Sequence, residues 1–202
     1  MKIIPHIDAP HENFIRSYDD VLPEAIFDDL FDIIDNRPYW TERSVPHNRK
    51  DAQIVLDESY SHLCKTITAH LMEKCVDKYA REFSGLLLPD SSIVSGATCL
   101  QKTNFGEGYH QWHCEKIGLY SDRDIAWMIY LNNVLSGGET EWLHQSVRIQ
   151  PRKNVAVLWP GGWTHLHRGT PPLSEAKYIL TGWLSLTPNK AGYKSVPLSI
   201  NS

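Results

Sequence analysis

Closely spaced turn residues cut the second half of the chain into short segments. The turn signals are Asn104-Phe105-Gly106, Ser121-Asp122, Ser136-Gly137-Gly138 and Pro160-Gly161-Gly162. The segments between them predict strands at 93–103, 109–117, 125–132, 140–143, 147–149, 153–159, 163–167 and 177–186. Many short strands joined by such turns are typical of a β-sandwich or a β-barrel.

The first half of the chain predicts mainly helices. Apolar residues recur at helical spacing from Leu22 to about Asp35, which predicts a helix. Pro23 stands in its first turn, a position that suits proline. A stripe with a step of four residues runs through 57–84 and indicates a second helix, or two abutting ones. Short strands are expected at 1–5 and 13–21.

Residues 36–53, between the helices, read NRPYWTERSVPHNRKDAQ, with two prolines, mixed charge and little periodicity. This composition predicts a loop, and long loops are commonly functional or disordered. Two interpretations stay open. The segment is a lid over a site, carrying Tyr39, Trp40, Arg43 and His47, or it is a packed surface loop.

His113 and Glu115 form a His-x-Glu pair inside the predicted strand 109–117. Residues two apart in a strand point to the same face, so both could hold one ion while Cys114 points away. A third ligand must come from elsewhere, and both His165 and His167 are available. Two imidazoles and one carboxylate on one face of an ion leave the opposite positions open, as in facial non-haem Fe(II) sites.

Lys177 begins the last predicted strand, ten residues after His167. A turn rich in glycine and proline at 169–172 would reverse the chain between them. In the alternating run KYILTGW, Lys177, Ile179, Thr181 and Trp183 share one face. A lysine that faces a barrel interior is costly unless it meets an anion, and a bound dicarboxylate would supply one.

Taken together, these motifs resemble those of the 2-oxoglutarate and Fe(II)-dependent dioxygenases, in their prolyl 4-hydroxylase-like branch. The matching motifs are His113-Cys114-Glu115, Tyr130-Leu131-Asn132, Gly137-Gly138-Glu139-Thr140, and His167-Arg168-Gly169-Thr170-Pro171 with Lys177. They cover about the C-terminal half of the chain. The family more often has Asp where Glu115 stands. Because Glu is one methylene longer, its carboxylate must fold back or the ion must shift.

The resemblance implies a mostly β fold, namely a double-stranded β-helix (a cupin-like jelly roll) with two N-terminal helices packed on one sheet. It implies a single domain over 1–202. Within it, 1–91 would be a helical support with the loop 36–53, 92–187 the jelly-roll core and 188–202 a C-terminal tail. It also implies Fe(II), with 2-oxoglutarate as cosubstrate and O2.

The resemblance further implies roles for particular residues. His113, Glu115 and His167 would bind the metal, and Lys177 would pair with the far carboxylate of 2-oxoglutarate, helped by Tyr130. Other residues are expected around the pocket. Thr181 would contact the cosubstrate, Met128 and Trp183 would line the pocket, and His110, His165, Tyr109, Gln101 and Trp40 are candidates for contacting substrate or orienting ligands.

The implied activity is hydroxylation of an unidentified substrate, either a peptidyl residue such as proline or a small molecule, with release of succinate and CO2. One alternative is another metal-dependent enzyme on the same cupin-like scaffold, such as a hydrolase that uses Zn or Mn. It has no need for Lys177. The other alternative is a non-catalytic binding module, which a missing metal ligand would signal.

Composition bounds the remaining possibilities. The length of 202 residues predicts one domain. The net charge of −4 argues against generic nucleic-acid binding. No apolar run approaches the ~20 residues of a membrane span. Four cysteines without a CxxC pair, and a start without a signal-peptide core, predict a cytoplasmic protein with reduced thiols. The expected partner is a small-molecule or peptide substrate.

Overall fold

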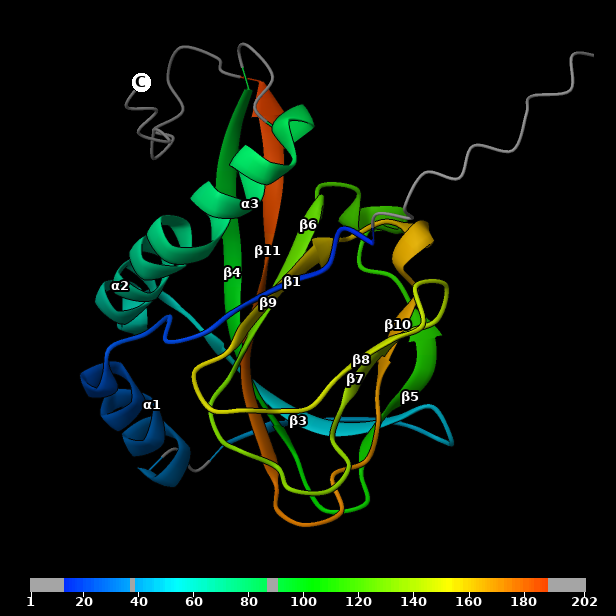
Figure 1. Ribbon diagram of the computed structural model, residues 1–202. Helices are drawn as coiled ribbons and strands as arrows, with labels where there is room; N and C mark the ends of the chain where they lie inside the picture. Colours follow the sequence, from blue (N-terminus) through cyan, green and yellow to red (C-terminus); the bar gives the residue numbers. More distant parts are fainter. Residues whose placement is uncertain (1–12, 37–38, 87–90, 189–202) are drawn as a thin grey trace, which may run out of the picture.

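The computed structural model describes residues 13–36, 39–86 and 91–188 of the chain (Figure 1). The expected strand at 1–5 and most of the expected tail at 188–202 lie outside these residues. The strands are β1 (Arg16–Tyr18), β2 (Thr41–Val45), β3 (Arg49–Leu56), β4 (Ser91–Thr103), β5 (Gly108–His113), β6 (Ile125–Tyr130), β7 (Thr140–Trp142), β8 (Val147–Ile149), β9 (Ala156–Pro160), β10 (His167–Gly169) and β11 (Lys177–Pro188).

The strands form one antiparallel ladder with two limbs. The first limb has the order β1-β9-β6-β11-β4-β3, with β2 added to β3, and the second has the order β5-β10-β7-β8. The limbs are joined where Arg49 and Lys50 of β3 pair with β5. Figure 1 shows the second limb to the right of the first, with the helices on the opposite side. The predicted jelly roll is therefore confirmed.

The helices cover the outer face of the first limb. They are α1 (Glu24–Asn36), α2 (Ser61–Leu71) and α3 (Asp77–Glu82), with a π-helical turn η2 (Met72–Val76) that joins α2 to α3. The segment predicted as a second helix is thus nearly continuous, interrupted by one π turn of the kind found inside α-helices. Single 3-10 turns lie at η1 (Glu58–Tyr60), η3 (Ser84–Leu86), η4 (Gly118–Tyr120) and η5 (Trp163–His165).

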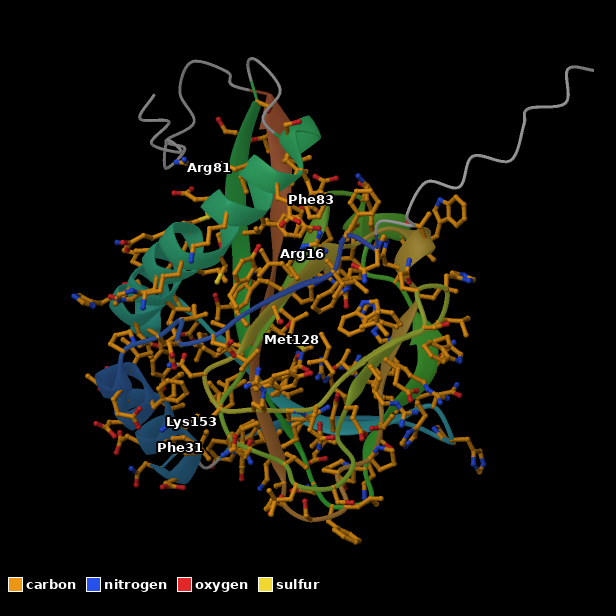
Figure 2. The ribbon with its side chains drawn as sticks, in the orientation of Figure 1. Arg16, Phe31, Arg81, Phe83, Met128 and Lys153 are labelled. Carbon is orange, nitrogen blue, oxygen red and sulfur yellow. The ribbon has the colours of Figure 1, made fainter. Side chains whose placement is uncertain are left out.

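Strand alternation separates two cores. Trp127 and Ile129 of β6 face the helices, where they join a large cluster with Phe27, Leu30 and Ile67. Their neighbours on β6 face the interior between the limbs, in a second cluster that contains Ala126, Met128 and Tyr130. Figure 2 labels Met128 in the middle of the barrel and Phe31 on the helical side. The residues of β6 thus alternate between the two cores, and full burial of each large apolar side chain contributes about 1.5–3 kcal/mol.

The chain before α1 is anchored to the end of the helical layer. Arg16 of β1 donates hydrogen bonds to Glu82, and its guanidinium lies 4.8 Å from the ring centroid of Phe83. Figure 2 labels Arg16 and Phe83 close together beside α3. Within the described residues, no helix combines the length and the apolar character that crossing a membrane requires.

The prediction of a loop at 36–53 is wrong for most of that segment, because β2 and β3 form a hairpin there. His47, in the turn between them, has a φ of +62°, a left-handed conformation suited to a tight turn. On β3, Ala52, Ile54 and Leu56 face the helices, whereas Arg49, Asp51 and Gln53 line the interior. The spacing of Ala52, Ile54 and Leu56 is the pattern of a half-buried strand, but it begins only at the end of a segment whose prolines and charges indicate a loop. The N-terminal part of the chain therefore contributes strands to the jelly roll as well as helices.

Two other predicted strands differ from the structure. Strand β5 ends at His113 instead of 117, and residues 163–165, predicted as strand, form the turn η5 before β10 begins at His167. Glycines at 161 and 162 start this turn. A Cβ on Gly161 would lie 2.2 Å from the Arg123 carbonyl oxygen, so the close approach of these two segments requires glycine.

Gly182 of β11 offers a test of the helix-facing core. It is buried, and a Cβ at this position would lie 2.5 Å from Trp127 and 2.8 Å from the Ala97 carbonyl oxygen. We expect Gly182→Ala to lower the free energy of unfolding by ~1–3 kcal/mol through overpacking. Denaturant titration measures this change. Gly85→Ala is the control, since a Cβ there meets nothing within 4 Å, and equal stability of the two variants would contradict the packing described here.

Candidate functional site

A cavity of about 570 Å³ opens between the two limbs. The residues that line it come from β2, β3, β4, β5, β6, β7, β9, β10 and β11 and from the segment 114–123. On β11 the lining residues are Lys177, Ile179, Thr181 and Trp183, which are the four that alternation places on one face. The interior of the barrel is thus a polar site on one side of the sheet, backed by the apolar core on the other.

Three potential metal ligands meet in this cavity. His113 is the last residue of β5 and His167 the first of β10, and these two residues are direct partners in the antiparallel pairing of their strands. Glu115 follows two residues after His113. One ligand atom from each of the three lies within 4.8 Å of the others, and no other such group of three is found in the described residues.

Glu115 reaches the site from a turn, not from the strand that the sequence predicted. The backbone N–H groups of Glu115 and Lys116 donate to the carbonyl oxygen of Gly161 at 3.0 and 2.8 Å. This contact bends the chain away from β5 directly after His113. The same-face relation expected for His113 and Glu115 is therefore achieved by a turn fixed from the opposite segment.

Both imidazoles are oriented by backbone carbonyls. His113 Nδ1 donates to Gln111 O and His167 Nδ1 donates to His165 O, each at 3.0 Å. A carbonyl oxygen only accepts, so in the neutral rings the proton is on Nδ1 and the lone pair is on Nε2. The two Nε2 atoms lie 3.7 and 3.2 Å from Glu115 Oε1. Three lone-pair atoms thus converge on one point, an arrangement that a divalent cation stabilises.

The other oxygen of Glu115 is anchored. Trp183 Nε1 donates to Glu115 Oε2 at 2.8 Å, and Arg123 Nη1 lies 3.4 Å from the same oxygen. The Arg123 guanidinium in turn lies 3.5 Å from the ring centroid of Trp183 and 3.8 Å from that of Tyr120. The longer Glu side chain is therefore accommodated, because one carboxylate oxygen faces the histidines while the other is held by Trp183.

The charge states of the site suit a metal. Burial, together with the neighbouring His167, lowers the pKa of His113 to about 4, so this ring is neutral at pH 7. Burial acts to raise the pKa of Glu115. In acid, where the rings carry protons, the hydrogen bond from His167 and the charges of the two histidines outweigh burial and lower that pKa to about 2. An ionised carboxylate and a neutral imidazole are the forms that bind metal.

The choice between His165 and His167 follows from their surroundings. The His165 ring interacts with the Asn13 carbonyl oxygen at 3.0 Å and with Thr164 Oγ1 at 2.9 Å, outside the cavity. His167 lines the cavity, in contact with Glu115. His165 serves the site through its backbone, since its carbonyl oxygen orients the His167 ring.

Lys177 lies in the same cavity at the start of β11. Its side chain is buried, and Nζ donates to the Gly138 carbonyl oxygen at 2.9 Å. Within the described residues no carboxylate forms an ion pair with it. Burial lowers the pKa of Lys177 to about 8, while the negative charges of Asp51 and Glu139 act in the opposite direction. The ammonium is therefore mostly charged at pH 7 and lacks a neutralising partner.

The remaining predicted residues fall into two groups. Tyr109, Gln101, Met128 and Thr181 line the cavity, and the Tyr109 ring stacks on His113 with centroids 3.8 Å apart. Thr181 Oγ1 donates to the Trp127 carbonyl oxygen. The residues that do not line the cavity are Tyr130, His110, His165 and Trp40.

Two of those residues depart from their expected roles. The Tyr130 hydroxyl is fully buried and donates to Thr140 Oγ1 at 3.0 Å, so it supports the cavity wall through Thr140 and does not face the cavity. Burial raises the pKa of Tyr130, which stays protonated. Trp40 packs against the helix-facing core, and its expected place at the site is wrong.

Residues that line the cavity but that sequence reasoning did not assign to the site include Arg49, Asp51, Gln53 and Arg123. Arg49 and Asp51 carried only a weak signal: they stand two residues apart, as residues on one face of a strand do, in a segment predicted as loop. Arg123 had none, since it lies in a turn and reaches Glu115 only through the fold.

Comparison with known proteins gives the same picture. Residues 100–185 match the family model described as the 2OG-Fe(II) oxygenase superfamily. The chain is 27% identical over 110 residues to the prolyl 4-hydroxylase subunit alpha-1 of Bos taurus, a match over 45% of this chain and 20% of the bovine protein. The chain thus spans about one fifth of that relative.

Solved prolyl hydroxylases share the fold. The viral collagen prolyl hydroxylase of Paramecium Bursaria Chlorella virus-1, in its 2OG complex, superposes with a TM-score of 0.64 at 17% identity, over 85% of this chain and 95% of that one. A prolyl hydroxylase of Trichoplax adhaerens, in complex with a hypoxia inducible factor peptide fragment, gives 0.67 at 18% identity, over 86% and 84%.

The fold, the ligand set and the family match all point to the 2OG-Fe(II) oxygenase superfamily, whose model matches residues 100–185. The bovine relative and both solved structures are prolyl hydroxylases, so the similarity is to the prolyl 4-hydroxylase-like branch. The residues present fit the metal and the cosubstrate named by that family. His113, Glu115 and His167 offer a facial set of two imidazoles and one carboxylate, and Lys177 offers an unpaired cation for a carboxylate.

The anchoring of Glu115 generates a prediction. Trp183→Phe keeps the ring beside Arg123 but removes the N–H that holds Oε2, so we expect Mn(II) affinity to fall by roughly tenfold or more. Calorimetric titration under nitrogen measures it. Trp159→Phe is a matched control, because Trp159 also lines the cavity but its buried Nε1 has no hydrogen-bond partner in the described residues.

The same prediction extends to the acidic ligand itself. In a Glu115→Asp background, Trp183→Phe should have little further effect, since the shorter side chain cannot reach both the ion and the indole. Undiminished metal affinity in Trp183→Phe alone, or full additivity of the two substitutions, would contradict the anchoring role.

Proposed function

We propose that the protein is a 2-oxoglutarate-dependent Fe(II) dioxygenase that hydroxylates a peptidyl residue such as proline, or a small molecule. The observation that carries the proposal is the presence of the three ligands and the unpaired Lys177 on the walls of one cavity. A metal-dependent hydrolase would need the three ligands but not a buried lysine without a counter-ion.

The residues of the chain would divide the work as follows. His113, Glu115 and His167 would hold the metal, with the Nδ1 hydrogen bonds fixing both rings. Lys177 would bind the far carboxylate of the cosubstrate, and burial would keep water away from that ion pair. Bound Fe(II) and 2-oxoglutarate would supply the oxidation of a C–H bond by O2, with release of succinate and CO2.

A peptide substrate is supported by the relatives. The Trichoplax prolyl hydroxylase was solved with a peptide fragment, and the bovine and viral relatives are named for prolyl and collagen prolyl hydroxylation. Fold and cofactor do not fix a substrate, so the proposal includes small molecules. The four cysteines are free thiols, which is compatible with the cytoplasmic location that we also propose.

The direct test is a succinate-release screen with Fe(II), 2-oxoglutarate and O2 against peptides and amino acids. We expect substrate-dependent succinate formation, and its loss in His113→Ala, Glu115→Ala and His167→Ala together with the bound iron. His165→Ala serves as the comparison and should keep its iron, because its ring points outside the cavity. Iron loss in His165→Ala with normal iron in His167→Ala would refute the ligand set.

Lys177 allows the cosubstrate to be tested apart from turnover. Removing one partner of a buried ion pair costs ~3–5 kcal/mol, so Lys177→Ala should weaken 2-oxoglutarate binding roughly a hundredfold or more. Metal binding should survive, because Lys177 is not a ligand. Titration of the Mn(II)-loaded protein under nitrogen measures both affinities.

Two further variants complete this test. Lys177→Arg should be milder than Lys177→Ala, because the charge stays, although Arg is longer and forked. Lys102→Ala is the control, since Lys102 lies on β4 beside the Tyr178 ring, outside the cavity. Unchanged 2-oxoglutarate affinity in Lys177→Ala would remove the anion pocket and favour the hydrolase alternative.

A further inference from the structure

The cavity is cationic, although the chain as a whole is acidic. Five cationic side chains line the cavity and only two acidic ones, while the whole chain has a net charge of −4. The cations are Arg43, Arg49, Arg123, Arg168 and Lys177, and the acids are Asp51 and Glu115. A concave surface of one charge sign concentrates ligands of the opposite sign, so this cavity attracts anions.

Two of the five cations pair with a carboxylate other than Asp51. Arg123 contacts Glu115, as described above. Arg168 Nε donates to Glu141 Oε2 at 2.7 Å, on the far side of β10 from the metal ligands. These two arginines contribute little net charge to the cavity, and three cations with one carboxylate remain.

Arg43 and Arg49 share that single carboxylate. Arg43 donates to Asp51 at 2.7 and 3.0 Å, and Arg49 donates to the same group at 3.1 Å through Nε and Nη2. Asp51 is buried and accepts from both guanidiniums, so its negative charge offsets only one of them. The other neighbour of Arg43 is the neutral amide of Gln53. One unit of positive charge is left on the hairpin.

The second excess cation is Lys177. Under the proposed function, the far carboxylate of 2-oxoglutarate neutralises it. The excess charge of Arg43 and Arg49 then has no counter-ion among the described residues or in the cosubstrate pocket. The pKa of Arg43 is lowered by burial and by the neighbouring charge of Arg49, which indicates that an added anion would be favourable here.

The arginine pair lies near the metal ligands. The Arg49 guanidinium lies 4.1 Å from the centroid of the Tyr109 ring, and Tyr109 stacks on His113 at 3.8 Å. A single aromatic ring thus separates Arg49 from a metal ligand. Both arginine side chains are about one-fifth exposed, and Arg49 Nη1 makes no hydrogen bond to the described part of the chain. An anion in the cavity can therefore reach free guanidinium donors.

We propose that Arg43 and Arg49 bind a carboxylate of the substrate, and that the substrate is therefore an amino acid or a peptide that carries a free carboxylate. The carboxylate is the α-carboxylate of an amino acid or chain end, or a side-chain carboxylate next to the reacting residue. This inference rests on the proposed function and specifies its substrate class. A carboxylate fits better than a phosphate dianion, because its single charge matches the single excess charge and its two oxygens match the fork of a guanidinium.

The test compares acids with their neutral counterparts. One arm uses blocked peptides that contain Glu-Pro or Gln-Pro and are otherwise identical. The other arm uses a panel of L-amino acids and the corresponding amides. Binding is measured by calorimetry under nitrogen on protein saturated with Mn(II) and 2-oxoglutarate, so that the Lys177 pocket is filled. We expect at least one arm to show the acid binding tenfold or more tighter than its neutral counterpart.

Substitutions assign the preference to the arginine pair. Arg49→Gln should bring the acid-to-amide affinity ratio close to one, with 2-oxoglutarate affinity retained. Asp51→Asn, which raises the local positive charge, should increase the ratio, and it provides an independent test if Arg49→Gln does not fold. Arg152→Gln is the control, because Arg152 pairs with Asp19 on the surface and is 63% exposed.

Each outcome has a distinct meaning. Equal affinity for acids and amides, or no binding of any acid at millimolar concentration, would overturn the inference. The inference would also be overturned if Arg49→Gln weakened 2-oxoglutarate binding and left the acid preference intact, because the arginine pair would then belong to the cosubstrate pocket. Acid-selective binding without succinate release would support the inference and contradict the proposed function. Succinate release without acid-selective binding would support the proposed function and contradict the inference.

Discussion

The pairing of β5 with β10 determines the rest of the site. It sets His113 directly opposite His167, and the two rings then have only one point toward which both Nε2 atoms can turn. Glu115 enters that point from the turn after β5, because its backbone is held by Gly161 on the segment that leads into β10. The same two strands therefore supply both imidazoles and position the carboxylate. A shift of one residue in this pairing would move one imidazole to the opposite face and dismantle the set.

Stability and chemistry occupy opposite faces of the same strands. Along β3, β6 and β11 the residues that face the helices are apolar and buried, as Ile54, Trp127 and Leu180 illustrate. The residues between them face the cavity and include polar and charged groups such as Arg49, Asp51 and Lys177. Because burial against the helices stabilises these strands, their inner faces can carry groups such as Lys177 and Asp51 whose burial is costly. Burial against the helical layer thus offsets the cost of a charged interior on the other side of the sheet.

The sequence predicted those parts of the fold in which apolar periodicity and the family motifs coincide. The inner face of β11, the helix α1 and the jelly roll itself follow from alternation, helical spacing and resemblance. The hairpin of β2 and β3 was missed because the prolines and the run of charged residues at 49–51 indicate a loop, and the alternating Ala52, Ile54 and Leu56 lie only at its end. The turn at Glu115 and the anchoring of its second oxygen by Trp183 and Arg123 could not be foreseen, since they depend on contacts between segments distant in sequence.

Strand β11 carries both Lys177 and Trp183 on one face, at opposite ends of the cavity wall. The first is the cation proposed for the cosubstrate and the second holds the acidic metal ligand, so a single strand links the two ends of the reaction centre. Insertion or deletion of one residue between them would turn one of the pair toward the helices. Natural variation in this stretch should therefore change side chains but not length, and the distance from metal to anion should be the least variable dimension among close homologues of the protein.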